Sequence, residues 1–420
     1  MKRVLLLAAT TGYQTRMFGE AAERLGVELV FATDRCDQIA DPWRDGAIAI
    51  RFHQEISAVD TIVSEAAARP IDGILAVGDR PTVIAAGVAR RLGLPGHSPE
   101  SAAAARDKRL TRECLRAGSL PVPWFTVVPL ATDPARLAEQ LSWPVVVKPA
   151  ALSGSRGVMR ADSLEDFIAR FERLRRLLMS ADVRALQDPA ALDIIVEQFI
   201  EGREYALEGV LEHGRLKALA VFDKPDPLDG PFFEETIYVT PSRLTDAEEQ
   251  RVRDAVAHGA AALGLRHGPI HAECRVNPRG VFVLEIAARP IGGLCARALT
   301  FDGPSGERAG LEELLLRHAV GESVGGWRRS RDASGVMMIP IPSGGVFRRV
   351  EGVDEALTVS GIDAIEITAK ADQHLVPLPE GSSYLGFIFA RAQAPADVER
   401  ALRDAHARLT FTVDRLVPVV

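Results

Sequence analysis

Residues 269–289 read PIHAECRVNPRGVFVLEIAAR, two runs rich in apolar residues that are joined by Asn277-Pro278-Arg279-Gly280. The alternation within each run and the turn-forming residues between them predict an antiparallel hairpin. If Val276 pairs with Phe282, the connection is five residues long and the apolar side chains fall on one face. These side chains are Ile270, Ala272, Cys274, Val276, Phe282, Leu284 and Ile286.

The same register places Glu273 directly opposite Glu285, on a face that also carries His271 and Arg289. Two facing carboxylates repel each other, and a divalent cation between them would remove the repulsion. Mg²⁺ typically takes one or two carboxylates together with phosphate oxygens. A register one residue shorter would put Glu285 among apolar side chains, which is costly. The hairpin alone leaves a second interpretation open, a solvated face with two ordinary surface glutamates.

The composition is that of a globular protein. The chain has 420 residues, 47% hydrophobic and 25% charged, with a formal net charge of -7. This length allows two to four domains, and nothing in the charge balance indicates nucleic acid or a membrane as a partner. Four scattered cysteines without a CxxC pair favour a reduced, cytoplasmic setting and no zinc. The first apolar run is too short for a signal peptide, and no segment qualifies as a transmembrane helix.

The first hundred residues alternate strand-like and helix-like segments. Strands are predicted at 3–9, 27–32, 47–51 and 72–77, which favours a parallel sheet. The turn Ala9-Thr10-Thr11-Gly12-Tyr13 lacks the GxGxxG pattern, which argues against a nicotinamide-binding domain. Gly78-Asp79-Arg80 follows the fourth strand, and we interpret it either as a ligand contact or as a turn and helix cap.

Further along the chain, the patterns predict two more units and a small C-terminal α+β domain. Strands are expected at 145–148, 194–200, 205–211 and 216–222, and helices at 164–186, 245–263, 353–358 and 395–408. Residues 321–331 are typical of a linker. The expected units are 1–105, 106–203, 204–327 and 328–420.

A glycine- and serine-rich loop follows a strand that ends in Lys148. The loop contains Ser153, Gly154, Ser155 and Gly157. Glycines let backbone N–H groups converge on phosphate oxygens, serines donate further hydrogen bonds, and lysine supplies a compact positive charge. The loop is not a Walker A motif, because the lysine precedes the glycines. A plain surface turn is the alternative.

A second segment, residues 197–204, leaves a buried strand and turns at a glycine. An adenine ring could stack on its apolar side chains, such as Phe199, and bind the backbone of Gln198 and Ile200. Glu204 could accept hydrogen bonds from both ribose hydroxyls. A strand with two glutamates is not specific by itself. Lysine is scarce in this chain, and its six positions are Lys2, Lys108, Lys148, Lys217, Lys224 and Lys370.

The order of these motifs resembles that of ATP-grasp enzymes over roughly residues 1–325. The motifs are Lys108, Lys148 with its loop, the segment 197–204, Glu273 and Glu285. Within the superfamily, the chain looks most like the L-amino acid ligases of the bacilysin synthetase type, which make dipeptides. The resembling segments are FDKP at 222–225, GPFFEET at 230–236, LEIAAR at 284–289 with Gly292-Gly293 after it, and LPEGSSYLG at 378–386.

The resemblance implies an ATP-grasp fold, α/β and α+β, with an N-terminal parallel-sheet domain. It implies an ATP-dependent carboxylate–amine ligase that forms an amide or peptide bond through an acylphosphate and releases ADP and phosphate. The cofactors would be ATP and Mg²⁺, with Mn²⁺ as an alternative ion. The substrates would be a small carboxylate and an amine, in particular amino acids, and the assembly is left open, a homodimer included. The loop 151–157 is expected to close as a lid, because an acylphosphate must be protected from water.

The resemblance also implies a role for each matched residue. ATP would be bound by Lys108, Lys148, Ser153, Gly154, Ser155, Gly157, Glu197, Gln198, Phe199, Ile200 and Glu204. The metal would be bound by Glu273 and Glu285. Arg289 and Lys148 would be catalytic. The substrates would be bound by Glu235, Arg289, Gly292, Gly293 and His271, and Gly292 and Gly293 are equally well a simple turn.

The chain departs from the family at two positions. Ala287 stands where many ATP-grasp enzymes have an asparagine two residues after the second metal glutamate. Gly293 stands near the position of a tryptophan in bacilysin synthetase, so we expect a pocket that admits something larger. Two alternatives to the ligase remain. One is an ATP-grasp enzyme of nucleotide or cofactor biosynthesis, of the biotin carboxylase or formyl-phosphate type, and the other is a non-catalytic nucleotide-binding regulatory module.

Overall fold

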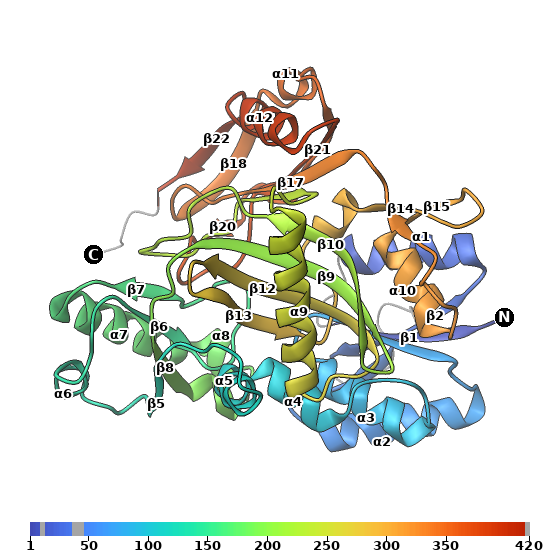
Figure 1. Ribbon diagram of the computed structural model, residues 1–420, viewed down its shortest axis with the longest axis horizontal. Helices are drawn as coiled ribbons and strands as arrows, with labels where there is room; N and C mark the ends of the chain where they lie inside the picture. Colours follow the sequence, from blue (N-terminus) through green and yellow to red (C-terminus); the bar gives the residue numbers. More distant parts are fainter. Residues whose placement is uncertain (9–12, 36–45, 416–420) are drawn as a thin grey trace.

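The computed structural model describes residues 1–8, 13–35 and 46–415. The turn Ala9-Thr10-Thr11-Gly12-Tyr13, on which the argument against a nicotinamide site partly depends, lies almost wholly outside these residues. Among the described residues, no helix is both long enough and apolar enough to cross a membrane. Figure 1 shows the N-terminal part, residues 106–203 (the lid unit) and the C-terminal part arranged around a large central sheet.

The N-terminal unit is a parallel sheet with the order β3-β2-β1-β4. Its strands are β1 (Arg3–Ala8), β2 (Glu28–Asp34), β3 (Ile48–Ile50) and β4 (Gly73–Val77). Its helices are α1 (Tyr13–Leu25), α2 (Glu55–Ala68) and α3 (Thr82–Leu92). Leu5 and Leu7 of β1 pack into one hydrophobic cluster, and Val4 and Leu6 pack into another. Both faces of β1 are therefore covered, which explains its uninterrupted apolar sequence and confirms the predicted parallel sheet.

The lid unit contains a four-stranded antiparallel sheet with the order β5-β8-β6-β7. Its strands are β5 (Phe125–Pro129), β6 (Val145–Pro149), β7 (Met159–Ala161) and β8 (Asp193–Gln198). Two helices lead into the unit, α4 (Pro99–Arg106) and α5 (Lys108–Ala117). Its own helical segments are α6 (Pro134–Ala138), α7 (Leu164–Leu178), α8 (Ala181–Arg184) and η1 (Pro189–Leu192). The single helix predicted at 164–186 is wrong at its end. The Ser180 hydroxyl donates to the Leu177 carbonyl at 2.6 Å, and the chain starts a new helix after it.

The central sheet has eight strands in the order β13-β12-β9-β10-β11-β17-β21-β19. Five of these strands come from residues 203–327. They are β9 (Arg203–Glu212), β10 (Arg215–Asp223), β11 (Ile237–Thr240), β12 (Gly268–Asn277) and β13 (Gly280–Ala287). Those from the C-terminal part are β17 (Ala333–Ile339), β19 (Ile362–Ile367) and β21 (Gly386–Ala392). Helix α9 (Asp246–Ala262) lies over one face of this sheet, against β10, β12 and β13 (Figure 1). The division into four units stays a prediction, but two of those units share one hydrogen-bonded sheet.

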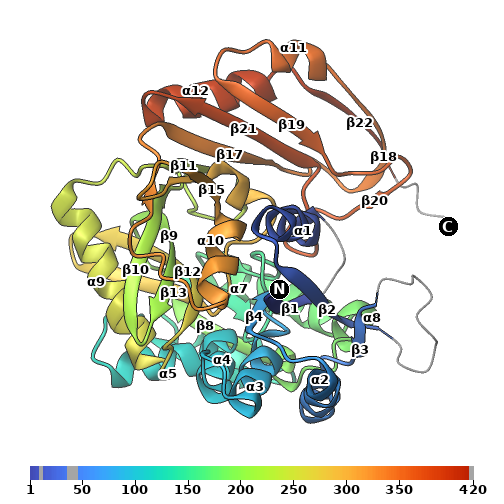
Figure 2. The same cartoon turned by 90° about the vertical axis from the view of Figure 1, so that its right-hand side faces the viewer.

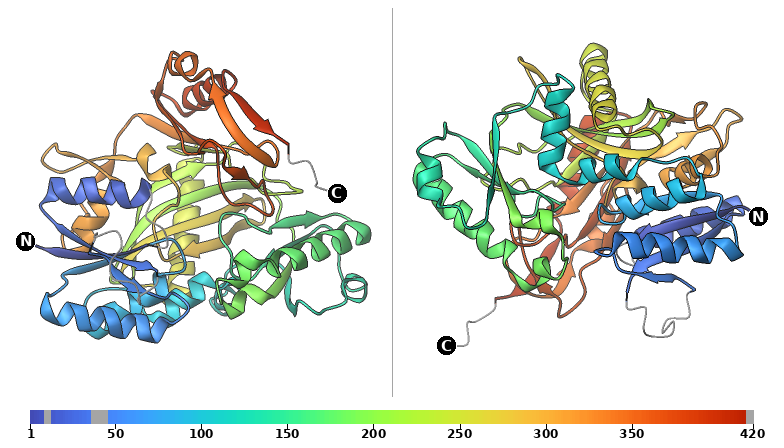
Figure 3. Two further views of the ribbon diagram at one scale, coloured as in Figure 1. Left: turned by 180° about the vertical axis from the view of Figure 1, so that it is seen from behind. Right: turned by 90° about the horizontal axis from the view of Figure 1, so that it is seen from below.

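The remaining elements complete the core and the C-terminal part. They are η2 (Cys295–Ala298), β14 (Thr300–Asp302), β15 (Arg308–Gly310), α10 (Leu311–Ala319), β16 (Arg328–Arg329), β18 (Gly345–Glu351), α11 (Val353–Leu357), β20 (His374–Leu375), α12 (Pro395–His406) and β22 (Thr410–Asp414). Figure 2 shows α12 lying across β17, β21 and β19. Figure 3, from behind, shows the N-terminal sheet and the lid unit on opposite sides of the central sheet.

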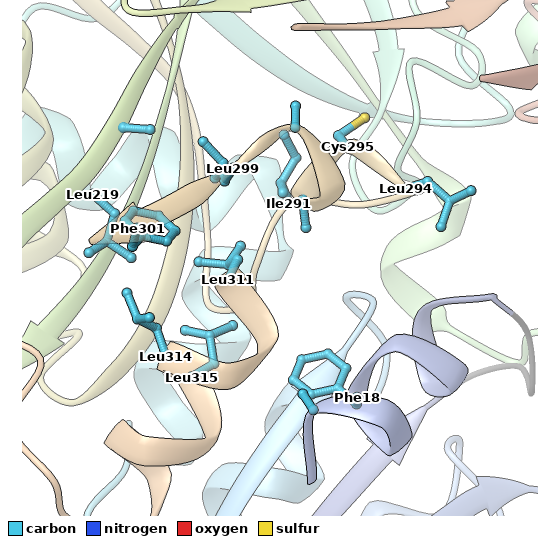
Figure 4. Close-up of a cluster of buried hydrophobic side chains, with 14 of the residues drawn as sticks. Phe18, Leu219, Ile291, Leu294, Cys295, Leu299, Phe301, Leu311, Leu314 and Leu315 are labelled. Carbon is cyan, nitrogen blue, oxygen red and sulfur yellow. The ribbon is translucent and has the colours of Figure 1, made fainter. Parts of the chain in front are cut away.

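One hydrophobic cluster joins the N-terminal unit to the central sheet. Phe18 of α1, Leu219 of β10 and Leu314 of α10 belong to it (Figure 4). The segment 291–301 runs through the same cluster, with Ile291, Leu294 and Cys295 buried. The backbone at 291–295 is therefore supported from below by well-packed side chains, which fixes the position of Gly292 and Gly293 between them.

The β12–β13 hairpin has the predicted pair of glutamates but a different turn. Glu273 pairs with Glu285, as predicted. Val276, however, pairs with Val281 and not with Phe282, so the predicted five-residue connection is wrong. The paired strands end at Asn277 and Gly280, so the turn consists of the two residues Pro278 and Arg279, and a β-bulge at Leu284 absorbs the extra residue.

The bulge also changes which side chains face the core. Val281 and Val283 belong to the hydrophobic cluster under α9, whereas Phe282 and Leu284 do not. The prediction that Phe282 and Leu284 share the apolar face is therefore wrong. Leu284 instead lines a cavity between the central sheet and the loop that follows Lys148.

Candidate active site

A cavity of about 510 Å³ lies where the N-terminal sheet, the lid loop, the central sheet and the C-terminal part meet. Every predicted site residue except Gly157 lines it. They are Lys108, Lys148, Ser153, Gly154, Ser155, Glu197, Gln198, Phe199, Ile200, Glu204, Glu235, His271, Glu273, Glu285, Arg289, Gly292 and Gly293. Gly157 lies beside Leu174 of α7 instead, where an added Cβ atom would come within 2.9 Å of that side chain, and its N–H donates to the Pro379 carbonyl at 2.9 Å.

A buried ionic triad lies at one end of the cavity. The Lys148 ammonium donates to Glu197, and the Arg112 guanidinium binds the same carboxylate with Nε–Oε2 at 2.9 Å and Nη2–Oε1 at 3.2 Å. Burial would raise the pKa of Glu197, but Arg112 and Lys148 outweigh it and lower that pKa to about 2. Two cations and one anion leave one uncompensated positive charge away from water. Such a site suits an anion.

The Lys148 ammonium is itself poised between charge states. Burial lowers the pKa of Lys148, Glu197 raises it, and Arg112 lowers it again, so that the pKa falls to about 8. An arriving phosphate would stabilise the protonated form. Lys108 lies nearby, where its Nζ donates to the Leu152 carbonyl at 2.6 Å and lies 3.9 Å from Glu285 Oε2. Lys148 therefore precedes the glycine loop in the sequence, and Lys108 contacts the beginning of that loop.

A second ionic cluster surrounds Lys224, at the end of β10. Its ammonium donates to Glu204 Oε1 at 2.8 Å and to Glu235, and it lies 3.1 Å from Glu273 Oε1. Carboxylate oxygens of the three glutamates lie within 4.8 Å of one another. Glu204 also accepts from Arg275 Nε at 3.1 Å. Burial and the neighbouring Glu273 raise the pKa of Glu235 to about 7.

Glu273 and Glu285 face each other on β12 and β13. Burial would raise the pKa of Glu273, but the Lys224 ammonium and the nearby His271 side chain hold it well below its usual range. Two opposed carboxylates on rigid strands, open to a cavity that also contains Lys108 and Lys148, form a donor set that suits Mg²⁺ bound to phosphates. The residues present therefore fit the metal that the motif predicts.

His271 is held between two carboxylates. Its Nδ1 lies 3.1 Å from Glu208 Oε2, and its Nε2 lies 3.6 Å from Glu273 Oε1. Burial would lower the pKa of His271, but the bonds to Glu208 and Glu273 raise it to about 9. Glu208 is fully buried and also accepts from the Ile291 N–H at 3.2 Å. His271 is therefore an imidazolium at neutral pH, which argues against a general-base role and for a structural charge.

Arg289 reaches across to the N-terminal unit. Its Nε lies 2.7 Å from Asp79 Oδ1 and its Nη2 lies 3.1 Å from Oδ2, which is a two-pronged ion pair. Burial would raise the pKa of Asp79, but Arg289 lowers it overall. The Asp79 carbonyl meanwhile accepts from the Thr82 hydroxyl at the start of α3. Asp79 therefore lines the cavity and precedes α3, whose N-cap is Pro81, and the ligand contact stays a prediction.

The C-terminal part supplies one wall of the cavity. The wall residues from this part are Met338, Thr368, Gln373, Ser382, Ser383, Tyr384 and Phe387. Gly293 adopts φ 62°, and a Cβ atom there would lie 3.2 Å from the Phe387 ring. Any side chain at 293 would therefore press against this wall.

The lid unit and the C-terminal part are clamped together beside the cavity. The Glu380 carboxylate accepts two hydrogen bonds from Arg173 of α7, from Nε at 2.6 Å and from Nη2 at 2.8 Å. The Glu380 carbonyl also accepts from Arg156 Nε at 2.7 Å, next to the glycine loop. The loop is thus held in a position that covers the cavity.

Comparison with known proteins places this geometry in a family. Residues 19–96 match the ATP-grasp N-terminal domain, residues 141–298 the ATP-grasp domain, and residues 337–414 the L-amino acid ligase C-terminal domain 2. The chain belongs to the ATP-grasp family. Its fold, with an N-terminal parallel sheet and this C-terminal domain, confirms the predicted fold class.

Relatives of this ATP-grasp protein include two ligases and an uncharacterized protein. An L-amino acid ligase from Bacillus licheniformis has a similar structure, with a TM-score of 0.82, 25% identity and 99% of each chain covered. The alanine–anticapsin ligase of Bacillus subtilis is 30% identical over 57% of this chain. That alignment spans about half of the relative, 52% of its length. Uncharacterized protein y4rH of Sinorhizobium fredii is 25% identical over 98% of this chain and 84% of the relative.

Several residues of the ATP-grasp site were not predicted from the sequence. Lys224 gave a signal, because lysine is scarce and FDKP was among the resembling segments. Asp79 also gave one, at the end of a predicted parallel strand. The C-terminal wall gave one in part, because Ser382, Ser383 and Tyr384 lie in the resembling segment LPEGSSYLG. Arg112 gave none, since an arginine in a charged helix is a common surface feature.

Proposed function

We propose that this protein is an ATP-dependent carboxylate–amine ligase that joins amino acids, or an amino acid and another carboxylate, through an acylphosphate. The observation that carries the proposal is one cavity that contains Lys148, the facing glutamates and Arg289, in a chain whose full length resembles an L-amino acid ligase. The three-domain match and the alanine–anticapsin ligase relatives support the same reaction class. They do not favour the carboxylase-type or non-catalytic alternatives.

The first step would be attack of a substrate carboxylate oxygen on the γ-phosphorus of ATP. A new P–O bond forms, the bond to the β-phosphate oxygen breaks, and ADP leaves. Lys148 and Lys108 would bind the phosphates, together with N–H groups of the loop that contains Ser153 and Gly154. Glu273 and Glu285 would hold Mg²⁺, which when bound neutralises phosphate charge. The protein contributes mainly position and charge.

The second step would be attack of the amine on the acyl carbon, with phosphate as the leaving group. Arg289 has a planar fork of donors that matches a carboxylate or a phosphate. Asp79 occupies that fork in the structure, so an anionic substrate must compete with it. The N–H groups of Gly292 and Gly293 are candidates for binding the developing oxyanion, because their backbone is rigidly supported and faces the cavity.

The setting proposed for this ligase is the cytoplasm. Cys114, Cys274 and Cys295 are free thiols, as a reducing compartment would keep them. Mn²⁺ should replace Mg²⁺ to some extent, because both are hard cations that accept carboxylate and phosphate ligands.

The decisive experiment is a screen of amino acids and other carboxylates for ADP release, with hydroxylamine added to trap an acylphosphate. A hydroxamate that forms only with ATP and one class of carboxylate would support the proposal and identify the acyl donor. ADP release stimulated by bicarbonate or formate, without a hydroxamate from any amino acid, would contradict it and favour the carboxylase-type alternative.

A further inference from the structure

Arg112 is the largest of the fully buried side chains, on the helix α5 that begins with Lys108. Its guanidinium contacts two other elements. On β8 it binds Glu197, as described above, and on β13 its Nη1 donates to the carbonyls of Val283 at 3.4 Å and Leu284 at 2.8 Å. A buried guanidinium is costly unless its donors are paired, and here the partners come from two separate strands.

The two carbonyls that Arg112 binds belong to the bulged residue of β13 and to the residue before it. Leu284 is the extra residue of β13, and a bulge leaves the backbone of that residue without its regular partner. Since β13 is the edge strand of the central sheet, no further strand lies beside it to accept the pairing. Arg112 supplies the missing donors from the side and so stabilises the bulged conformation.

The bulge decides where Glu285 points. Between the turn and the bulge, Val276 pairs with Val281 and Cys274 with Val283. Continued without a bulge, that register would pair Glu273 with Leu284 and would turn Glu285 towards the hydrophobic core. The bulge shifts the register by one residue, and Glu273 then meets Glu285.

We infer that Arg112 is a positioning residue of the metal and phosphate site. It fixes the bulge that turns Glu285 towards Glu273, and through Glu197 it orients Lys148. The inference rests on the proposed function, since it assigns to Glu285 and Lys148 the roles given there. Arg112 itself lies behind these residues and is not among those that line the cavity.

The test compares wild type with Arg112→Met and Arg112→Lys. Methionine keeps an unbranched apolar stem without donors, and lysine keeps the charge for Glu197 but lacks the fork that reaches both carbonyls. Arg109→Met is the matched control, because Arg109 lies on the same helix with its side chain 39% exposed. Binding of Mn²⁺ in the presence of ADP is measured by electron paramagnetic resonance. Hydrogen exchange of residues 280–287 reports on the bulge.

We expect both Arg112 variants to bind Mn²⁺ more weakly, by about 10- to 100-fold for Arg112→Met, as is typical when a residue that orients a metal ligand is lost. The 280–287 segment should exchange faster in both, and Arg109→Met should match wild type. A folded Arg112→Met with unchanged Mn²⁺ affinity and unchanged exchange would overturn the inference. If Arg112→Met does not fold, the same two readouts on Arg112→Lys decide. Failure of wild type to bind Mn²⁺ with ADP would instead count against the proposed function.

Discussion

Replacing Lys224 by methionine should destabilise the protein and create a cation site in its place. The Lys224 side chain is 3% exposed and its ammonium is the common partner of Glu204, Glu235 and Glu273. Burial alone would lower the pKa of Lys224, but the three carboxylates raise it well above its usual value. Removing one partner of a buried ion pair typically costs about 3–5 kcal/mol, and here three carboxylates lose their shared cation. We expect a loss of about that size in the free energy of unfolding at pH 7.

The loss should shrink when the pH is lowered. Without the ammonium, the pKa values of the clustered carboxyl groups rise in the folded state, so the folded state of the variant binds more protons than the unfolded state. The stability of Lys224→Met should therefore recover, relative to wild type, as the pH falls from 7 towards 5. A divalent cation should also restore stability. For a dissociation constant of about 1 mM, 10 mM Mg²⁺ would contribute about 1.4 kcal/mol without nucleotide.

The assay is urea denaturation at pH 7 and pH 5, with and without Mg²⁺ and without nucleotide. Lys370→Met, at an exposed lysine, is the control for loss of a charge. Wild type and this control should show no comparable response to Mg²⁺ alone. The reasoning would be refuted if Lys224→Met were as stable as wild type at pH 7, or if it lost stability without any response to pH or to Mg²⁺.

Three further outcomes are expected. Glu285→Gln should abolish ADP release, because one of two facing carboxylates is lost; retained turnover with normal Mg²⁺ dependence would contradict the metal assignment. Glu380→Gln should loosen the clamp to Arg173 and raise the share of ATP that is hydrolysed without amide formation. The free energy of unfolding should change by less than about 1 kcal/mol, because the pair is partly exposed. Equal ratios of ADP to amide in the variant and in wild type would argue against the clamp. Burial lowers the pKa of His97 and of His267 to about 4, against 6.5 in the unfolded chain. The unfolded state therefore binds more protons between these values, and the urea midpoint should fall as the pH drops from about 6.5 to 4, more steeply in wild type than in His97→Gln.

Local pattern was enough to predict most helices and strands and the pairing of Glu273 with Glu285. Apolar alternation and continuous apolar runs depend on neighbours in the sequence, which is why β1, β6 and the hairpin could be read directly. The turn of the hairpin was mispredicted because a bulge costs little and its position depends on Arg112, 172 residues away from Leu284.

The unpredicted part of the candidate site consists of contacts between distant segments. Asp79 meets Arg289 across 210 residues of sequence, and Arg173 meets Glu380 across 207. The periodicity within one helix or strand does not indicate which distant residue will form an ion pair with a charged side chain of that element. The resemblance to ATP-grasp enzymes supplied the residues that share a motif, and the residues outside those motifs became visible only in three dimensions.

The position of β11 has a consequence for how the protein is made. This four-residue strand joins β10 through a single paired position, Asp223 with Val239, but joins β17 through four. During synthesis, β17 leaves the ribosome about a hundred residues after β11, so the first half of the sheet emerges with an unpartnered apolar edge. A chain shortened before residue 333 would keep that edge permanently. The last fifth of the chain is therefore needed to finish the sheet as well as to enclose the cavity, and truncated forms should aggregate rather than act as a smaller enzyme.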